Sequence, residues 1–439
     1  MKPRDKIHQQ LYWLLSIAIV VSLPFSLKLC SWSIGLLTLN WLVEGGFRRK
    51  FDIIKSSLFL KLIILFALLH IVSLIYSTDL NHGMFVLEIK LAILVLPIVI
   101  GTIPKLSHNS LRVVLVSFIV SCAATAMISL SLSFFDQPTA DSIYTNFDHI
   151  TAEKYTSQFI NSSQSWLLFS YVGLSHHINL HPTYFSMYLL FSICLIVFLY
   201  RDRLVEMKIL SKIILSSLVG LFVITIMLLS SRIVIIAMIL LLLVSIFRYF
   251  YRVKGYFQGI LMSISALLII SVVIYQNPVT RYRLIQEPLM LENNLSENPD
   301  WNSVSLRILE WKASLNIIKD NSIIGVGIGD IRNALNSQYH RMADLREFDI
   351  NLNSHNQYLQ TTATLGILGL SLLLGIIIYP ALAAYKKKEY LYLTYIFIFS
   401  ICFLTESMLE VQKGIVFFAL FHSLLFFHPA VAPKNVANE

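Results

Sequence analysis

The stretch ILSKIILSSLVGLFVITIMLLSSRIVIIAMILLLLVSIF, residues 209–247, decides the fold class. It consists of two long apolar runs separated by one polar turn, Ser230-Ser231-Arg232. Each run contains at most one charged residue. In lipid such a run must be a helix, because a helix satisfies its own backbone hydrogen bonds. The stretch therefore predicts two membrane-spanning helices joined by a short turn.

The same pattern recurs along the whole chain of 439 residues, of which 56% are hydrophobic and 13% charged. An ordinary soluble domain carries about 25% charged residues. The sequence therefore predicts an all-α polytopic membrane protein that forms a single transmembrane domain, residues 1–439. About twelve transmembrane helices are expected, near residues 11–27, 29–43, 58–76, 84–103, 111–135, 182–200, 209–229, 233–247, 256–275, 363–385, 391–404 and 415–427.

The formal charge of +9 indicates membrane orientation and not nucleic-acid binding. Its basic residues cluster in alternate gaps between the apolar runs, as in Arg48-Arg49-Lys50 and Lys386-Lys387-Lys388. By the positive-inside rule these gaps are cytoplasmic, and an even number of spans places both termini there. The expected partners are thus membrane lipids, with no nucleic acid.

On this topology two large segments, 136–181 and 276–362, lie on the outer side. The second is the principal candidate for function. Within it, apolar residues at helical spacing predict an amphipathic helix from Ser303 to Lys319. The apolar stripe of that helix is expected to contain Val304, Ile308, Trp311, Leu315 and Ile318.

Nothing in the sequence indicates a metal ion or a cofactor. The four cysteines lie singly in or beside apolar runs, and we interpret them as small buried residues. No Asp-x-Asp pair and no His/Cys cluster with metal-ligand spacing is present. The sequence Gly325-Val-Gly-Ile-Gly-Asp330 lacks the features of a phosphate loop, so a tight turn that lets backbones approach is the favoured interpretation.

His355 is the candidate general base. It lies in Ser354-His355-Asn356-Gln357, where Ser followed three residues later by Gln has the spacing of a capping box. This spacing predicts a helix from His355 to Tyr379, with His355 in its first turn just outside the lipid. A helix start attracts phosphate and disfavours a protonated imidazole, which suits a base. The alternative is an interfacial histidine that only hydrogen-bonds a loop.

Two arginines are candidate ligands of a phosphate group. Arg232 lies in the turn between two spans at the outer interface, and a guanidinium group there can bind phosphate oxygens in pairs. Its alternative role is contact with lipid headgroups. Arg307 lies on the predicted amphipathic helix, and its alternative role is a solvated charge paired with Glu310.

Several other polar residues are weaker candidates. Arg281 and Arg283 follow the ninth predicted span, and His181 precedes Pro182 at the start of the sixth. A capping or packing role is the alternative for His181. The charges within predicted spans, Lys61, Glu88 and Lys90, lie near the span ends, where snorkelling to the interface is expected.

Taken together, these features resemble the O-antigen ligase and O-antigen polymerase superfamily. The resemblance lies in the number of spans, in the large loop before the tenth, and in three motifs. The motifs are Ser231-Arg232, the stretch from Ser305-Leu-Arg307 to Gly325-Val-Gly-Ile-Gly329, and Ser354-His355-Asn356-Gln357-Tyr358-Leu359.

The resemblance is closest to O-antigen ligases. It implies a glycosyltransferase in the bacterial inner membrane with a periplasmic active site and a partly helical periplasmic loop region. The reaction would move a glycan from an undecaprenyl-diphosphate-linked donor to a sugar hydroxyl of lipid A core, with inversion and without a metal. Arg232 and Arg307 would bind the diphosphate and His355 would activate the acceptor. His181, Arg281, Arg283, Ser231 and Tyr358 are candidates for lining the site.

Two other functions compete with the ligase. A glycan polymerase of the same fold would use the same donor but take another lipid-linked glycan as its acceptor. A lipid-linked glycan flippase or transporter would also have many spans. It is disfavoured because ionisable groups at mid-membrane and broken spans, both typical of transporters, are not evident in the sequence.

Overall fold

Each apolar run predicted from the sequence falls on a helix in the computed structural model of the protein. The structure describes residues 3–135, 170, 172–178, 180–286, 303–343 and 352–429. These residues contain helices and connecting turns and no β-strand, so the all-α class is confirmed. The predicted outer segment 136–181 lies almost wholly outside the described residues.

The first helices are α1 (Pro3–Ser22), α2 (Leu27–Glu44), α3 (Phe47–Ser56), α4 (Leu58–Ser73), η1 (Leu74–Tyr76), α5 (Leu80–Thr102), α6 (His108–Phe135), α10 (Val172–His176), α11 (Pro182–Tyr200) and η3 (Arg201–Arg203). They are followed by α12 (Ile209–Leu229), α13 (Arg232–Lys254), α14 (Tyr256–Gln276), α15 (Pro278–Arg281) and η4 (Tyr282–Gln286). The last are α17 (Ser303–Asp320), α18 (Ile331–Ala343), α19 (Gln357–Lys386), α20 (Tyr390–Cys402), η5 (Met408–Glu410) and α21 (Gln412–Phe427).

Among the described residues, eight helical segments are long and apolar enough to cross a membrane. They are α4 with η1, α5, α6, α11 with η3, α12, α13, α14 and α19. The apolar helices α20 and α21 have only 13 and 16 residues, against the roughly 20 of a usual span. The protein is thus a multi-pass membrane protein, and its last two apolar helices are short, as the sequence predicts.

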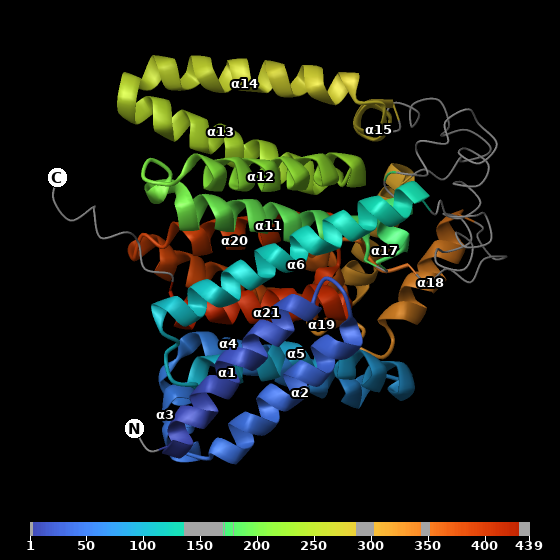
Figure 1. Ribbon diagram of the computed structural model, residues 1–439. Coiled ribbons are helices and arrows are strands. Elements are labelled where there is room, and N and C mark those ends of the chain that lie inside the picture. The colour runs from blue at the N-terminus through green and yellow to red at the C-terminus, as the bar shows by residue number, and fades with distance from the viewer. Residues whose placement is uncertain are drawn as a thin grey trace. The chain divides into compact units, whose positions relative to one another are not determined.

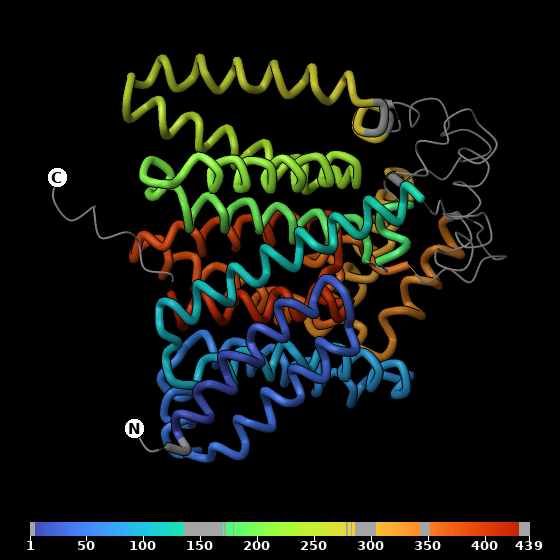
Figure 2. The backbone as a smooth tube through the Cα atoms, viewed as in Figure 1, coloured from blue at the N-terminus to red at the C-terminus, as the bar shows by residue number. Residues whose placement is uncertain are grey.

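The chain folds into two units. The first comprises the described parts of Met1–Cys122, Cys194–Lys212 and Leu309–Glu439, and the second those of Ala123–Ile193 and Ile213–Ile308. In the first unit α5 packs against α21 and α4, α1 pairs with α2, and α19 packs against α4 and α20 (Figure 1). In the second unit α13 and α14 form an antiparallel pair (Figure 2).

The helix α21 is the centre of the first unit. All of residues 413–425 are buried, and a helix that is apolar on every side belongs in a protein core. Aromatic rings pack around it: Phe417 and Phe421 lie 5.6 and 4.8 Å from the ring of Phe118 on α6. Because protein surrounds most of α21, this helix does not need the roughly 20 residues of a span that faces lipid.

The helix α19 is broken at Gly366, which has a φ of 67°. The glycine-rich turn before α18 fills the break, since Val326 and Gly327 donate backbone hydrogen bonds to the carbonyls of Ala363 and Thr364 at 3.0 and 2.9 Å. Such a break in a helix of a membrane protein is tolerated when protein satisfies its backbone in this way. The prediction of unbroken spans is therefore wrong, and the prediction of a tight backbone contact at the glycines is confirmed.

Candidate active site

His355 lies in the connection before α19, and the predicted capping box is not formed. The helix begins at Gln357, with Asn356 as its N-cap residue, whose side chain accepts a hydrogen bond from the Leu359 amide at 3.0 Å. The hydroxyl of Ser354 instead donates to Oε1 of Gln360. His355 has a φ of 39°, so it is outside the helix, and the helix start does not account for its chemistry.

Two buried carboxylates flank the imidazole ring of His355. Its Nδ1 is 3.2 Å from Oε2 of Glu406, and its Nε2 is 3.9 Å from Oε1 of Glu310. The side chains of Glu406 and Glu310 are 4% and 2% exposed, whereas that of His355 is 24% exposed. An ionised carboxylate only accepts hydrogen bonds. The shorter distance favours a proton on Nδ1 directed towards Glu406, and Nε2 then faces Glu310.

A hydrogen-bonded network fixes the loop that carries His355. Ser354 is fully buried and receives a hydrogen bond from the hydroxyl of Ser314 on α17, at 2.8 Å. Both its backbone amide and its hydroxyl donate to Oε1 of Gln360, at 3.0 and 2.7 Å. The loop is thus bound to α17 on one side and to α19 on the other, which restricts the position of the ring.

The helix predicted at Ser303–Lys319 is confirmed as α17, but its predicted apolar face is wrong. Ile308 and Leu315 are exposed, at 41% and 53%. The buried face instead contains Leu309, Glu310, Ala313, Ser314 and Ile317. The reason is that Ser314 and Glu310 face the loop of His355. Polar contacts, and not apolar periodicity, decide which side of α17 is buried.

The charge of Glu310 also affects the pKa of the buried Tyr339 of α18. Burial raises the pKa of its hydroxyl, and the negative charge of Glu310 raises it further. The hydroxyl therefore stays protonated at neutral pH. Glu310 is thus a buried charge that interacts with both Tyr339 of α18 and His355.

A second polar cluster adjoins the start of α19. Lys90 of α5 is 7% exposed, and its Nζ lies 2.7 Å from Oε1 of Glu410 and 2.8 Å from the carbonyl oxygen of Leu409. Gln357 accepts a hydrogen bond from the Leu409 amide at 2.6 Å. The prediction that Lys90 snorkels to the interface is wrong, because an acidic partner from the α20–α21 connection lies beside it.

Tyr358 is directed towards α20. Its hydroxyl donates to the carbonyl oxygen of Ser400 at 3.1 Å, and its ring packs edge-on against Phe403 with centroids 5.9 Å apart. These contacts join α19 to α20. They give Tyr358 a structural role in supporting the loop that holds His355.

The second unit contains the turn of Arg232, which has the predicted form. The turn joins α12 to α13, and Arg232 is the first residue of α13 after the N-cap residue Ser231. The Nε of Arg232 donates to the carbonyl oxygen of Arg283 at 2.7 Å. A helix start carries a partial positive charge that repels a guanidinium group. Arg232 is therefore placed where an anion would stabilise it.

Other predicted residues gather around the same turn. The hydroxyl of Ser231 donates to that of Thr183 at 3.2 Å, and the Thr183 amide lies 3.4 Å from Nδ1 of His181. His181 is exposed and immediately precedes α11, which begins at Pro182 as predicted. The starts of α11 and α13 and the segment after α14 thus lie together. The guanidinium group of Arg281 instead lies 5.6 Å from the ring centroid of Tyr275.

Arg307 lies on the first turns of α17 and is partly buried. It precedes Glu310 by three residues on that helix. The structure thus presents two groups of candidate residues, His355 with its carboxylates in the first unit and Arg232 with Ser231, Arg283 and His181 in the second. Their convergence on one substrate stays a prediction.

Backbone strain marks both groups. Among the described residues, only Ser230, His355 and Lys388 are non-glycine residues with positive φ. Ser230 immediately precedes Ser231-Arg232, and His355 is the candidate base. Strained backbone persists where the surrounding structure enforces it, and such positions concentrate at functional sites.

A comparison with known families identifies the relevant part of the chain. The family model described as O-antigen ligase matches residues 217–374, just over a third of the chain. This stretch of the chain is similar to the O-antigen ligase domain. This domain begins within α12, ends within α19 and includes Arg232, Arg307 and His355. No match is found among the curated proteins.

The O-antigen ligase domain confirms the resemblance to this superfamily. The match supports a membrane glycosyltransferase of the O-antigen ligase or polymerase type. Glu406, Glu410 and Lys90 lie outside the matched residues, and sequence reasoning missed their roles. The signal for the first two was a pair of acidic residues in the short break between the last two apolar runs.

Proposed function

We propose that the protein transfers a glycan from undecaprenyl diphosphate to a sugar hydroxyl of lipid A core, as an O-antigen ligase. The transfer inverts the anomeric centre and needs no metal ion. The observation that carries the proposal is the position of His355 between two buried carboxylates, inside the matched domain. In this arrangement the imidazole can accept a proton and the resulting charge is stabilised.

His355 acts as the general base. The acceptor hydroxyl donates its proton to Nε2 of His355 while its oxygen forms a bond to the anomeric carbon. Because Nε2 is 3.9 Å from Oε1 of Glu310, a hydroxyl that donates to Nε2 lies close to the charge that stabilises the protonated ring. Once protonated, the ring donates from Nδ1 to Glu406 and faces Glu310 with Nε2. General base catalysis of this kind contributes about 10²- to 10⁴-fold.

Arg232 and Arg307 bind the leaving group. As the bond from the anomeric carbon to the phosphate oxygen breaks, its electron pair stays on undecaprenyl diphosphate. Two guanidinium groups stabilise that developing charge, and they remain protonated at any working pH. The placement of Arg232 at a helix start, where an anion is favoured, supports this role. His181, Ser231 and Arg283 lie beside Arg232 and line the diphosphate site.

The orientation follows from the basic clusters. Both termini and the Lys386–Lys388 connection are cytoplasmic, and the loops that carry His355 and Arg232 lie on the periplasmic side of the inner membrane. The part of α19 beyond its break, residues 367–386, is about 30 Å long at 1.5 Å per residue, which matches the hydrocarbon core. The segments 136–181 and 276–362 are the two large periplasmic loops.

A polymerase remains the second candidate, because the matched family describes a fold that serves both reactions. The two differ only in their acceptor. A deletion strain distinguishes them: loss of a ligase leaves polymerised glycan on the lipid carrier, whereas loss of a polymerase leaves single repeat units attached to lipid A core.

The broken helix α19 and the buried Lys90 bear on the choice between an enzyme and a transporter. Both features are typical of transporters and were not expected from the sequence. Here protein backbone fills the break, and Lys90 is paired with Glu410 beside the loop of His355. Both features thus support the position of the candidate base, which favours the enzyme.

Purified protein tests the proposal directly. It is supplied with undecaprenyl-diphosphate-linked glycan and lipid A core in the presence of a chelator. We expect His355→Ala to lower transfer by about 10²- to 10⁴-fold and Arg307→Ala by about 10²-fold. The matched controls are His108→Ala at the start of α6 and Lys312→Ala on α17, both exposed. Transfer that stops in chelator, or that His355→Ala leaves unchanged, contradicts the mechanism.

A further inference from the structure

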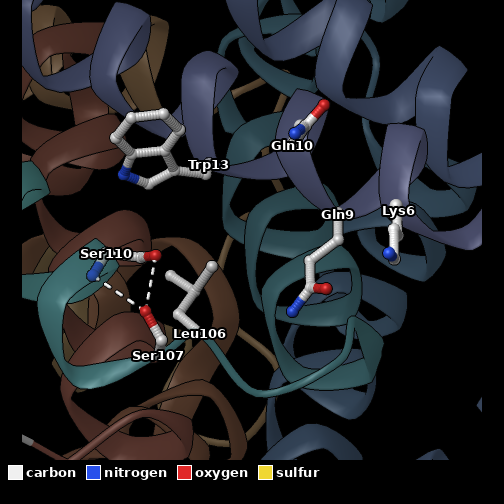
Figure 3. A pocket seen from close by; sticks show the side chains of 7 residues that line it. All are labelled: Lys6, Gln9, Gln10, Trp13, Leu106, Ser107 and Ser110. Atoms are coloured by element: carbon white, nitrogen blue, oxygen red, sulfur yellow. Dashed lines mark hydrogen bonds between the residues drawn. The ribbon is translucent and has the colours of Figure 1, made fainter. Parts of the chain in front are cut away.

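A cavity of about 360 Å³ lies between the start of α1 and the turn that begins α6 (Figure 3). Volumes of roughly 300 to 1,000 Å³ are typical of sites for small molecules. The polar residues that line this cavity are Lys6, Gln9, Gln10 and Trp13 from α1, and Ser107 and Ser110 from the other side.

This cavity is separate from the site of His355. The turn that lines it follows the Thr102 end of α5, where Trp41 donates to the hydroxyl of Thr102 at 2.7 Å. The same end is joined to the end of α21, because the Leu106 amide donates to Nδ1 of His428 at 3.1 Å. The residues that contact Gln357, next to the loop of His355, instead meet α5 at Lys90, about three turns earlier.

The lining of the cavity has the chemistry of an anion site. Lys6 is the one charged residue in the lining, and no carboxylate is among the lining residues. Gln9 and Gln10 supply amide donors, and serine hydroxyls face them. The buried indole Nε1 of Trp13 has no acceptor among the described residues. The indole ring of Trp13 lines the cavity together with these donors.

The start of α6 adds to this preference. The hydroxyl of Ser107 accepts a hydrogen bond from the Ser110 amide at 3.1 Å, and its carbonyl oxygen accepts one from the Leu111 amide at 2.9 Å. Ser107 is thus the cap of a 28-residue helix. The partial positive charge of that helix start lies at the cavity and favours a negative ligand.

The other side of α1 is suited to acyl chains. Ile7, Leu11 and Leu14 follow one another at helical spacing, and they are 56%, 38% and 51% exposed. This strip lies about 100° around the helix from the residues that line the cavity. A molecule with an anionic head and apolar tails can therefore contact both surfaces of α1 at once.

We propose that this cavity binds the phosphate headgroup of an anionic glycerophospholipid, with its acyl chains along Ile7, Leu11 and Leu14. Lys6, the amides of Gln9 and Gln10 and the start of α6 hold the phosphate. Arg49 donates to the carbonyl oxygen of Thr102 at 3.3 Å and Lys105 immediately precedes the lining turn. Basic pockets between helices are typical sites for anionic lipids. The lipid fastens the first helix to the α5–α6 turn.

Tryptophan quenching tests this proposal with full-length protein. The protein is reconstituted with brominated phosphatidylglycerol or brominated phosphatidylcholine, and the quenching that Trp13→Phe abolishes is assigned to Trp13. We expect brominated phosphatidylglycerol to quench Trp13 at several-fold lower mole fraction. Lys6→Gln should weaken this preference about fivefold, the effect of one basic residue near an anionic headgroup. Gln9→Glu, which adds a carboxylate of the same size, should weaken it as well.

The control is Lys55→Gln, which removes the same charge from an exposed residue of α3 outside the cavity. Equal quenching by the two lipids overturns the proposal, as does an equal effect of Lys55→Gln and Lys6→Gln. Displacement of brominated phosphatidylglycerol by millimolar inorganic phosphate in detergent also overturns it, because the ligand would then be a free anion. The readout is binding, so its outcome is independent of glycosyl transfer.

Discussion

Glu406 should be essential for the base, because it fixes the tautomer of His355. Its carboxylate lies 3.2 Å from Nδ1 of the ring and is 4% exposed, so no solvent molecule replaces it easily. The substitution Glu406→Gln keeps the size but puts an amide there. That amide can donate to Nδ1 and thereby leave the proton on Nε2, where it blocks acceptance of the proton from the acceptor hydroxyl.

The magnitude follows from the geometry. In a Ser-His-Asp triad the corresponding change lowers kcat about 10⁴-fold. Here the 3.2 Å distance is at the long end for an N–H···O hydrogen bond, so the ring is less tightly held. We therefore expect a loss of about 10²- to 10³-fold in kcat, with little change in the KM for the lipid-linked donor.

The assay is transfer by purified protein across a range of pH. Loss of the carboxylate makes the imidazolium less stable, so the acidic limb of the pH profile should move to lower pH. Glu406→Asp, which keeps the charge, should recover part of the rate, and Glu206→Gln in the exposed α11–α12 connection is the control. A kcat of Glu406→Gln within about twofold of wild type would refute the reasoning.

Two further predictions concern the turn that fills the break in α19. A methyl group at Gly366 or Gly325 would overlap the backbone of Ile323 or Thr364, and both glycines have positive φ. Each Gly→Ala change should therefore lower the free energy of unfolding by about 2 to 5 kcal/mol, which thermal unfolding in detergent can measure. The control is Gly220→Ala, which has open space around it and should not destabilise the protein. Asp330 of the same turn is partly buried, which raises its pKa. Hydrogen bonds from the Asp79 and Thr78 amides and the Thr78 hydroxyl outweigh that effect and hold the pKa below its usual value. The ionised Asp330 therefore contributes its full stabilisation above about pH 3.9, the pKa of an aspartate in the unfolded chain. This stabilisation is lost as the pH falls through the lower pKa of the folded protein. On acidification the melting temperature of wild type should thus fall more steeply than that of Asp330→Asn. Equal slopes for the two proteins would contradict this assignment.

The membrane class and the helices could be predicted from the sequence because lipid leaves the backbone few alternatives. A long apolar run must close its own hydrogen bonds, so every predicted run is found on a helix. The Ser231-Arg232 turn was equally predictable, because the two apolar runs on either side of it must each form a span and the polar residues between them must form the turn. The motifs then indicated the family, and the matched domain includes all three.

The face of α17 and the surroundings of His355 could not be predicted. Apolar spacing placed Leu315 inside, whereas the structure buries Ser314 and Glu310. The spacing of Ser354 and Gln357 suggested a cap, whereas Ser354 is bound by Gln360. In both cases hydrogen bonds to segments distant in the chain outweigh a local preference that is worth about 1 kcal/mol.

The sequence by itself determined that the chain is helical, lies in a membrane and carries the O-antigen ligase motifs, because these properties depend on runs of neighbouring residues. Only the tertiary structure decided that Glu406 and Glu310 flank His355, that Glu410 neutralises Lys90, and that a glycine turn fills the break in α19. Contacts between residues 45 to 320 positions apart leave no periodic trace in the chain. They form only when helices pack and buried charges must find partners.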